Sequence, residues 1–325
     1  MREKKGSYLL VAFLSVVILL STALAAEKFP SREIQLVSAN RPGGFVDIAI
    51  RFMSDNLSKE LGVPVVVSNR AGAGGAVGTT YLIKSKPDGY TIGSISSADV
   101  VLLPATVPNI PFKYSDLDPL CKYASSTSGI FCKTESPWKT LEDLVADGKK
   151  RPGQITYGAT THSVSHLQME SFMKAAGFSM MHVPLQAAGE TITRVLGGNL
   201  DIGISSMAPL VGQLKAGTLR ALFIIAPERV SAFPQIPTLK EKGYPNPVLT
   251  LYTGFFAPLG LPNPVRETLE KALEKVIKEP TLKKRLDDVS LALEYLPRKA
   301  FAKEIEEDTK QITEFAKTSG FLKSK

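Results

Sequence analysis

Residues 41–47 carry groups that could bind an anion. Gly43 and Gly44 lack the Cβ atoms that keep a ligand away from the backbone. The apolar spacing after them predicts a helix, whose amino terminus presents free N–H groups and favours a negative charge. Asp47 falls in the first turn of this helix, where its carboxylate could brace the loop by accepting loop N–H groups. Arg41 could pair with a ligand carboxylate, or it could stay solvated at the rim.

Small polar residues recur after other predicted strands. In an α/β sheet these strand ends share one edge, so the loops that follow them are the expected ligand site. Residues 160–163 precede a predicted helix and offer hydroxyls and backbone donors for a second anion site. The candidate ligand-binding residues are Arg41, Gly43, Gly44, Phe45, Asp47, Ser96, Ser97, Thr160, Thr161, His162, Ser163, Ala187, Ala188 and Ser205. Loops that face each other from two lobes could clamp a ligand between them.

Enzymatic alternatives have little support in the sequence. His162, His166 and Glu170 are spaced i, i+4, i+8 and would share a helix face, so a metal site is one alternative. The histidine pair lacks the intervening glutamate of a zinc protease, and no Gly-x-Ser-x-Gly elbow is present for a hydrolase. The glycine-rich residues 71–78 imitate a dinucleotide fingerprint, but they follow the second predicted strand instead of the first. We therefore expect no enzymatic activity, no cofactor and no metal, with an exported metal-dependent enzyme as the weaker alternative.

Short β-branched segments alternate with longer helical patterns, which predicts an α/β fold with parallel strands. A first unit has predicted strands at 34–37, 63–67 and 90–95. A second unit has predicted strands at 155–157, 181–183, 201–203 and 219–225.

Extended segments separate the two units at two places. One is the proline-rich stretch 107–111 with the apolar residues that begin at Leu120, and the other is residues 249–257. Residues 265–325 are helical by pattern. A chain that crosses twice between lobes returns its carboxyl-terminal helices to the first lobe and has a hinge. We therefore predict lobe 1 from residues 27–125 plus 254–325, and lobe 2 from residues 126–253.

The first 25 residues are typical of an export signal. Arg2, Lys4 and Lys5 precede the apolar run from Tyr8 to Leu20, and residues 23–25 supply small residues for cleavage. We expect cleavage of residues 1–25 and a location in the periplasm. The net charge is +8, but the lysines are scattered and form no basic stripe with aromatic residues, which argues against nucleic acid as a partner.

Two cysteines, Cys121 and Cys132, flank residues 125–128. A hairpin that turned at residues 126–127 would place them opposite each other, and an exported chain meets oxidising conditions. A disulfide and a pair of buried free thiols both remain open, because the sequence does not give the Cβ separation.

Several short motifs, in collinear order over nearly the whole mature chain, resemble those of the substrate-binding receptors of tripartite tricarboxylate transporters, the TctC or Bug family. The motifs are Pro42-Gly43-Gly44 with Asp47, Asn69-Arg70-Ala71-Gly72-Ala73-Gly74-Gly75 with Gly78, Pro87-Asp88-Gly89-Tyr90-Thr91, His182-Val183-Pro184, Leu196-Gly197-Gly198 with Asp201, Lys215-Ala216-Gly217, Leu219-Arg220-Ala221-Leu222, Pro237-Thr238 and Phe256-Ala257-Pro258.

This resemblance implies a type II periplasmic-binding-protein fold, in which two α/β lobes are joined by two crossover strands. It also implies a monomeric receptor that holds a small carboxylate by amides, hydroxyls and water and delivers it to membrane permease subunits. Residues 159–163 depart from the family, in which glycines and a serine usually precede the counterpart of His166-Leu167. Phe45 and His162 could contact an aromatic acid, while di- and tricarboxylates remain open. A ligand-sensing partner of a membrane signalling protein is the alternative function.

Overall fold

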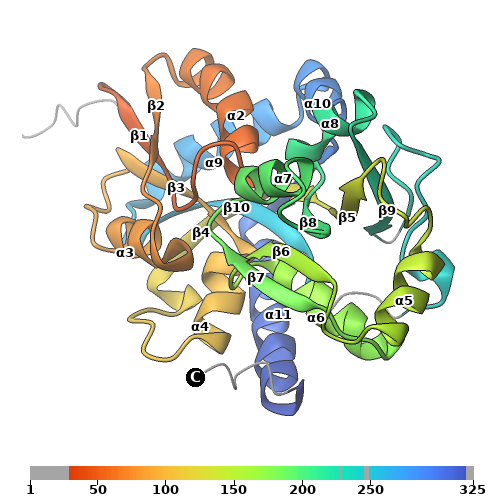
Figure 1. Cartoon of the computed structure of the whole chain (residues 1–325). Coiled ribbons are helices and arrows are strands. Elements are labelled where there is room, and N and C mark those ends of the chain that lie inside the picture. Colours follow the sequence, from red (N-terminus) through yellow and green to blue (C-terminus); the bar gives the residue numbers. More distant parts are fainter. Residues whose placement is uncertain (1–28, 227, 245–248, 320–325) are drawn as a thin grey trace, which may run out of the picture.

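The computed structural model describes residues 29–226, 228–244 and 249–319 (Figure 1). The export signal predicted over residues 1–25 lies outside the described residues. Among the helices of these described ranges, none has both the length and the hydrophobicity needed to cross a membrane.

The first sheet, sheet A, combines strands from both ends of the described chain. Its six described strands have the spatial order β11-β4-β10-β3-β1-β2, and β1 pairs in parallel with β2 and β3. The strands β10, β4 and β11 pair antiparallel along the other half. The strand bounds are β1 (Ile34–Ser38), β2 (Val65–Asn69), β3 (Thr91–Ser96), β4 (Leu117–Ser126), β10 (Leu251–Pro258) and β11 (Leu291–Pro297).

The second sheet, sheet B, uses only the middle of the chain. Its five described strands have the order β7-β6-β8-β5-β9, with β6 parallel to β7 and β8, and β5 antiparallel to β8 and β9. The strand bounds are β5 (Ser128–Lys133), β6 (Thr156–Thr160), β7 (Met181–Leu185), β8 (Ile202–Ser206) and β9 (Leu219–Ile225). The α/β class predicted from the sequence is confirmed.

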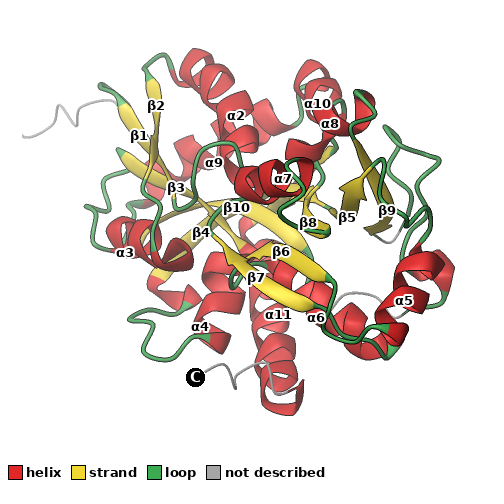
Figure 2. Cartoon of the chain, viewed as in Figure 1, coloured by secondary structure: helices red, strands yellow, loops and turns green. Residues whose placement is uncertain are grey.

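Helices cover both faces of each sheet (Figure 2). Helices α2, α9 and α10 share one buried cluster with sheet A, while α3 and α11 pack on its other face, with α4 against α11. Helices α5 and α6 cover one face of sheet B, and α7 and α8 cover the other. The helix bounds are α2 (Phe45–Leu61), α3 (Ala76–Ile83), α4 (Leu103–Thr106), α5 (Leu141–Lys150), α6 (Val164–Ala176), α7 (Ala188–Leu196), α8 (Val211–Lys215), α9 (Asn263–Ile277), α10 (Pro280–Asp287) and α11 (Arg298–Ser319).

The chain passes from sheet A to sheet B through one continuous extended segment, so residues 126–127 do not form the hairpin that would have placed the two cysteines opposite each other. Ser126 ends β4 in sheet A, and Ser128 begins β5 in sheet B. The reason lies in the residue types, because two-residue hairpin turns need Gly, Asn or Asp where φ is positive, whereas Ser and Thr suit an extended backbone.

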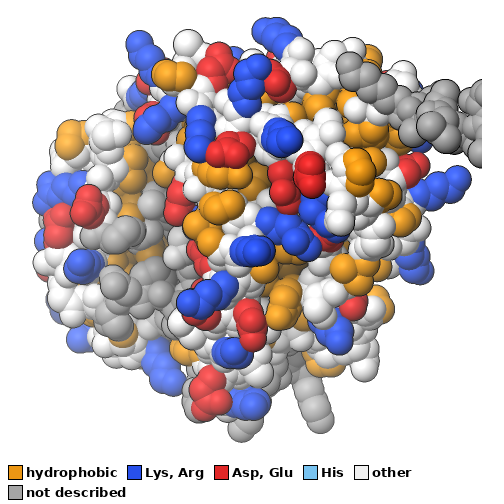
Figure 3. Space-filling view, turned by 180° about the vertical axis from the view of Figure 1, so that it is seen from behind, with side chains coloured by type: hydrophobic (Ala, Val, Ile, Leu, Met, Phe, Trp, Pro, Cys, Tyr) orange, Lys and Arg blue, Asp and Glu red, His pale blue; other side chains and the backbone are white. Residues whose placement is uncertain are grey.

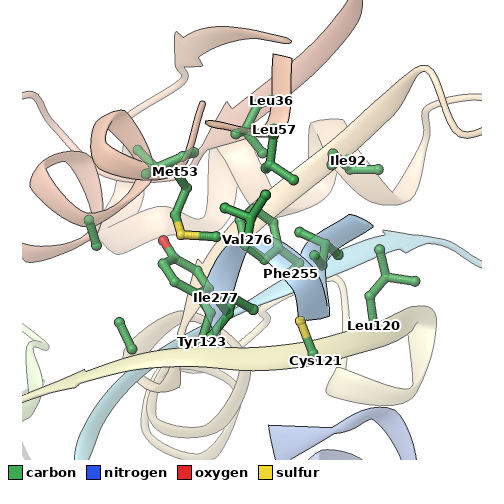
Figure 4. Packing of buried hydrophobic residues seen from close by; sticks show 14 of the residues in the cluster. Leu36, Met53, Leu57, Ile92, Leu120, Cys121, Tyr123, Phe255, Val276 and Ile277 are labelled. Atoms are coloured by element: carbon green, nitrogen blue, oxygen red, sulfur yellow. The ribbon is translucent and has the colours of Figure 1, made fainter. Parts of the chain in front are cut away.

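Consequently the two cysteines do not meet. Cys121 lies in the cluster between sheet A and helices α2 and α9 (Figure 4), and Cys132 lies in the cluster of sheet B with α5 and α6. Both thiols are free and buried, so the disulfide left open above does not form.

The carboxyl-terminal region is not helical throughout, which corrects the prediction for residues 265–325. Strand β11 interrupts it, and Ser290 turns the chain into this strand with a φ of 56°. The strand pairs with β4 at the edge of sheet A, and its side chains alternate in exposure from Leu291 to Leu293. This short alternating pattern lies between the strong helical patterns of α10 and α11, and for this reason the sequence did not predict the strand.

Helix α6 of the sheet B side packs against the sheet A side in a shared buried cluster. Val164 and Leu167 of α6 belong to the cluster that contains Tyr252 and Phe301 of the sheet A side. The lobe boundaries at 27–125 plus 254–325 and at 126–253 stay a prediction, although sheet membership changes close to both of them.

Candidate functional site

A cleft opens between the two sheets at the ends of β1, β3, β6, β7 and β8. It consists of two neighbouring chambers that share the lining residues Asn40, Arg41, Ala98, Thr160, Ser163 and Gln186. Both sheets contribute to each chamber, so a bound molecule would contact both at once.

We call the first chamber the serine chamber. Its empty volume is about 730 Å³, including the part that is open to solvent. Besides the six shared residues it is lined by Gly44, Phe45, Val46, Ser96, Val164, Ser165, Ala187, Ala188, Ile204, Ser205, Ser206 and Leu251. Among these residues Arg41 is the one that carries a charge.

We call the second chamber the glycine chamber, because the loop between β2 and α3 forms one wall. Its empty volume is about 1140 Å³, again including open solvent. Besides the shared residues it is lined by Ala39, Ala71, Gly72, Ala73, Gly74, Gly75, Asp99, Leu103, Val107, Ile110, Thr161, His162 and Leu185.

Three helices begin at the serine chamber. Helix α2 starts after Gly44 and α7 starts after Ala187, and neither of these capping residues supplies a side-chain hydrogen bond to its helix. Helix α6 starts after Ser163, whose hydroxyl accepts the N–H of His166 at 3.1 Å. First-turn amides without a capping side chain, together with the helix dipoles, favour an anion at this place.

Asp47 stabilises the loop before α2 by hydrogen bonds. Its Oδ2 accepts the N–H of Gly43 at 2.9 Å and Nε of Arg51 at 3.0 Å, and its Oδ1 accepts Nδ2 of Asn69 at 2.8 Å. Burial alone would raise the pKa of Asp47, but the hydrogen bonds from Arg51, Gly43 and Asn69 outweigh it and hold the pKa below its usual range. Asp47 therefore supports the loop, as its position in the first turn suggested, but it lines neither chamber although the sequence made it a candidate ligand-binding residue.

Ser96 and Ser97 have different roles although they are adjacent. Ser96 lines the serine chamber and donates its hydroxyl to Oδ2 of Asp99 at 2.7 Å. Ser97 is buried away from the cleft, donates to the carbonyl of Thr250 at 2.9 Å and accepts the N–H of Tyr252 at 3.3 Å. Ser97 thus stabilises the start of β10, where the chain returns from sheet B to sheet A.

Arg41 from the sheet A side faces helix α7 of the sheet B side. The pKa of Glu190 in α7 lies below its usual value, mainly because it accepts the N–H of Gln186, with further contributions from Arg194 and from the charge of Arg41. Arg41 therefore brings to the cleft a positive charge that also acts on Glu190.

The proposed histidine face does not form, because His162 lies before helix α6 in a left-handed backbone conformation with a φ of 58°. His166 stacks on His182 at 4.1 Å between ring centroids, and burial lowers the pKa of His166 to about 3. In the described part of the chain, no three His, Cys, Asp or Glu side chains are arranged to hold a metal ion.

Charged side chains of both signs are interspersed on the face shown in Figure 3.

The structure brings most of the predicted site residues to one cleft. The serine chamber contains Arg41, Gly44, Phe45, Ser96, Thr160, Ser163, Ala187, Ala188 and Ser205, and the glycine chamber adds Thr161 and His162. Gly43, Asp47 and Ser97 line neither chamber. Sequence reasoning missed Asn40, Asp99, Ser165 and Gln186, of which Asn40 and Gln186 sit at the same strand ends and could have been found by that signal.

A sequence model described as the tripartite tricarboxylate transporter family receptor matches residues 49–321. The chain belongs to this family. BugT of Bordetella pertussis is 34% identical over 244 residues, which are 74% of this chain and 75% of BugT. The resemblance predicted from the motifs is confirmed.

Solved structures of this fold agree with the two-sheet architecture. A structure described as a periplasmic transporter is 31% identical, has a TM-score of 0.86 and covers 90% of this chain and 99% of its own. An R. palustris protein solved with adipate is 22% identical with a TM-score of 0.86, covering 90% of this chain and 99% of its own, and shows the same fold. The fold is that of the two-lobed periplasmic solute-binding proteins.

Proposed function

We propose that this receptor captures a small carboxylate in the cleft between its lobes, outside the cytoplasmic membrane, and delivers it to the membrane permease subunits of a tripartite tricarboxylate transporter. The observation that carries the proposal is the meeting of the first turns of α2, α6 and α7 at the serine chamber. Backbone amides at helix ends bind carboxylates without a fixed counter-charge. Adipate in the R. palustris protein of the same fold supports a carboxylate as the ligand class.

In this proposal the two segments that join the sheets act as the hinge. The first is Ser126–Ser128, where Thr127 is the single residue between β4 and β5, and the second enters β10 at Leu251, which lines the serine chamber. Closure would bring the amides of α7 toward those of α2 around the ligand. The receptor acts as a monomer and performs no chemistry on the bound acid.

Calorimetric titration of the mature chain against a panel of mono-, di- and tricarboxylates and aromatic acids tests the binding step. We expect at least one acid to bind at a 1:1 ratio. If no carboxylate binds and a solute of another class does, the proposal is wrong.

Uptake of the acid that binds tests the delivery step. A strain without the receptor should lose uptake of this acid, and the wild-type gene should restore it. If the strain keeps uptake and loses only a transcriptional response to the acid, the receptor serves a sensor instead of a permease.

A further inference from the structure

Three residues that line the glycine chamber each carry a buried polar atom with no hydrogen-bond partner among the described residues. These atoms are Oδ1 of Asn40, Oγ1 of Thr161 and Nδ1 of His162. Native proteins pair almost all of their buried polar atoms, and leaving one unpaired costs about 1–3 kcal/mol. The three residues lie at the end of β1 in sheet A and at the end of β6 in sheet B, so both sides of the chamber carry an unpaired polar atom. Their arrangement indicates a hydrogen-bonding group that enters the chamber from outside the protein.

A carboxylate of the protein already lies in the wall of this chamber. Asp99 is fully buried and accepts the backbone N–H of Ser96 at 3.0 Å and its hydroxyl at 2.7 Å, with Nδ2 of Asn40 at 3.5 Å. None of these partners carries a charge, so the negative charge of Asp99 is not neutralised by them. The backbone at Gly75 lies so close to Asp99 that a Cβ atom at this position would overlap the carboxylate.

The same chamber has an apolar side. Leu103, Val107 and Ile110 line it together with the polar residues of the loop after β6. A second ligand carboxylate placed here would meet apolar carbon and the like charge of Asp99, which disfavour it. Arg41 also lines the serine chamber, where it can pair with the first carboxylate. A hydroxyl or another uncharged polar group would not be repelled.

We propose that the glycine chamber is a subsite for the uncharged, hydrogen-bonding far end of the ligand, and that Asp99 excludes a second carboxylate from it. The ligand class is therefore a monocarboxylate with an apolar body and a distal hydroxyl or similar group. Its carboxylate lies in the serine chamber, and its distal group bonds to Asn40, Thr161 and His162. This inference rests on the proposed function, because it takes the serine chamber as the carboxylate site.

Two sets of matched acids test the proposal on the mature protein by calorimetric titration at pH 7.5. The first set is hexanoate, 6-hydroxyhexanoate and adipate, and the second is benzoate, 4-hydroxybenzoate and terephthalate. In at least one set we expect the hydroxy acid to bind about tenfold more tightly than both of its partners, since a hydrogen bond contributes about 1 kcal/mol or more.

Two variants test separately the charge of Asp99 and the hydroxyl of Thr161. Asp99→Asn should improve binding of the diacid about tenfold and change binding of the hydroxy acid less than threefold, because it removes the repelling charge and keeps the shape. Thr161→Val should remove most of the advantage of the hydroxy acid and leave the unsubstituted acid unchanged. The matched control is Asp55→Asn on the exposed side of α2, which should change none of these affinities.

The outcomes distinguish this inference from the proposed function. If both diacids bind wild-type protein at least as tightly as the hydroxy acids, the inference is overturned and the carboxylate receptor stands. The same holds if all six probes fail while another carboxylate binds. If no carboxylate of any kind binds, the proposed function falls and the inference falls with it. A misfolded Asp99→Asn protein would be recognised by its melting curve, and Thr161→Val then still decides the question.

Discussion

Replacing Asp99 by Asn should stabilise the protein at neutral pH, and the structure gives the size of the effect. Burial raises the pKa of Asp99 to about 6, although the hydrogen bonds from Ser96 and Asn40 partly oppose this rise. Compared with the usual value of about 3.9, the raised pKa corresponds to about 3 kcal/mol. Asn at position 99 can still accept both hydrogen bonds of Ser96 through its amide oxygen.

The sign of the pH dependence follows from the raised pKa. The stability that Asp99 contributes is fully present below about pH 4, where the carboxyl is protonated in both states, and is lost as the pH rises through about 6. Wild-type and Asp99→Asn proteins should therefore unfold with similar free energies at pH 4. At pH 7.5 the variant should be more stable by up to about 3 kcal/mol.

Urea unfolding of both proteins at pH 4, 6 and 7.5, followed by circular dichroism, measures this difference. Asp55→Asn is the matched control and should show no pH-dependent gain. If Asp99→Asn changes the free energy of unfolding by the same amount at all three pH values, Asp99 is compensated by a charge and our reasoning on the glycine chamber is refuted.

Two further predictions concern residues outside the chambers. Asp47→Ala should destabilise the protein by about 1–3 kcal/mol at pH 7, because it leaves the N–H of Gly43 and Nε of Arg51 without their acceptor. Because the pKa of Asp47 is depressed, this loss should shrink as the pH falls below about 4, and an unchanged melting curve at pH 7 would argue against the bracing role. Cys121 and Cys132 should react with a thiol reagent only after unfolding, and a reductant should not change the melting temperature. Absence of free thiols in the unfolded protein would contradict the separate burial of the two cysteines.

Much of the fold could be predicted from the sequence, because the strands of a parallel sheet have short, strong signals. Strands β1, β3 and β9 lie within a residue or two of their predicted positions. The glycines and hydroxyl residues after the strands located the cleft, since the topology of parallel strands gathers these loops at one edge.

The errors arose where the signal depends on distant parts of the chain. Whether residues 126–127 turn back or continue straight is decided by the two sheets that take up β4 and β5, and no local residue types required a turn. Strand β11 is short and is fixed by pairing with β4, which is far away in sequence. Residues 160–163 were predicted to precede the helix, and the hydroxyl of Ser163 indeed caps α6, which begins at Val164. Only the metal-site alternative put His162 on the helix, and it rested on spacing alone.

Asp99 was missed for a different reason. A single aspartate in an apolar stretch does not reveal whether it faces solvent, the protein core or a cavity. Only the folded chain brings Asp99 to Ser96 and Asn40 at the wall of the glycine chamber. Its importance for the choice of ligand therefore becomes visible only in three dimensions.

The most direct test of the receptor's central feature is the affinity of a Gly44→Val protein for the acid that the wild-type protein binds. Gly44 has a φ of −86°, and a Cβ atom there would come no closer than 3.7 Å to the carbonyl oxygen of Arg41, so the fold accepts a side chain at this position. The side chain would cover the amides at the start of α2, and we expect binding to weaken at least about tenfold, since a hydrogen bond to a charged group contributes about 1.5–3 kcal/mol. The control Gly212→Val adds a side chain in open space away from both chambers and should bind like the wild type. If Gly44→Val also binds with unchanged affinity, the amides of α2 do not hold the ligand and the carboxylate site lies elsewhere.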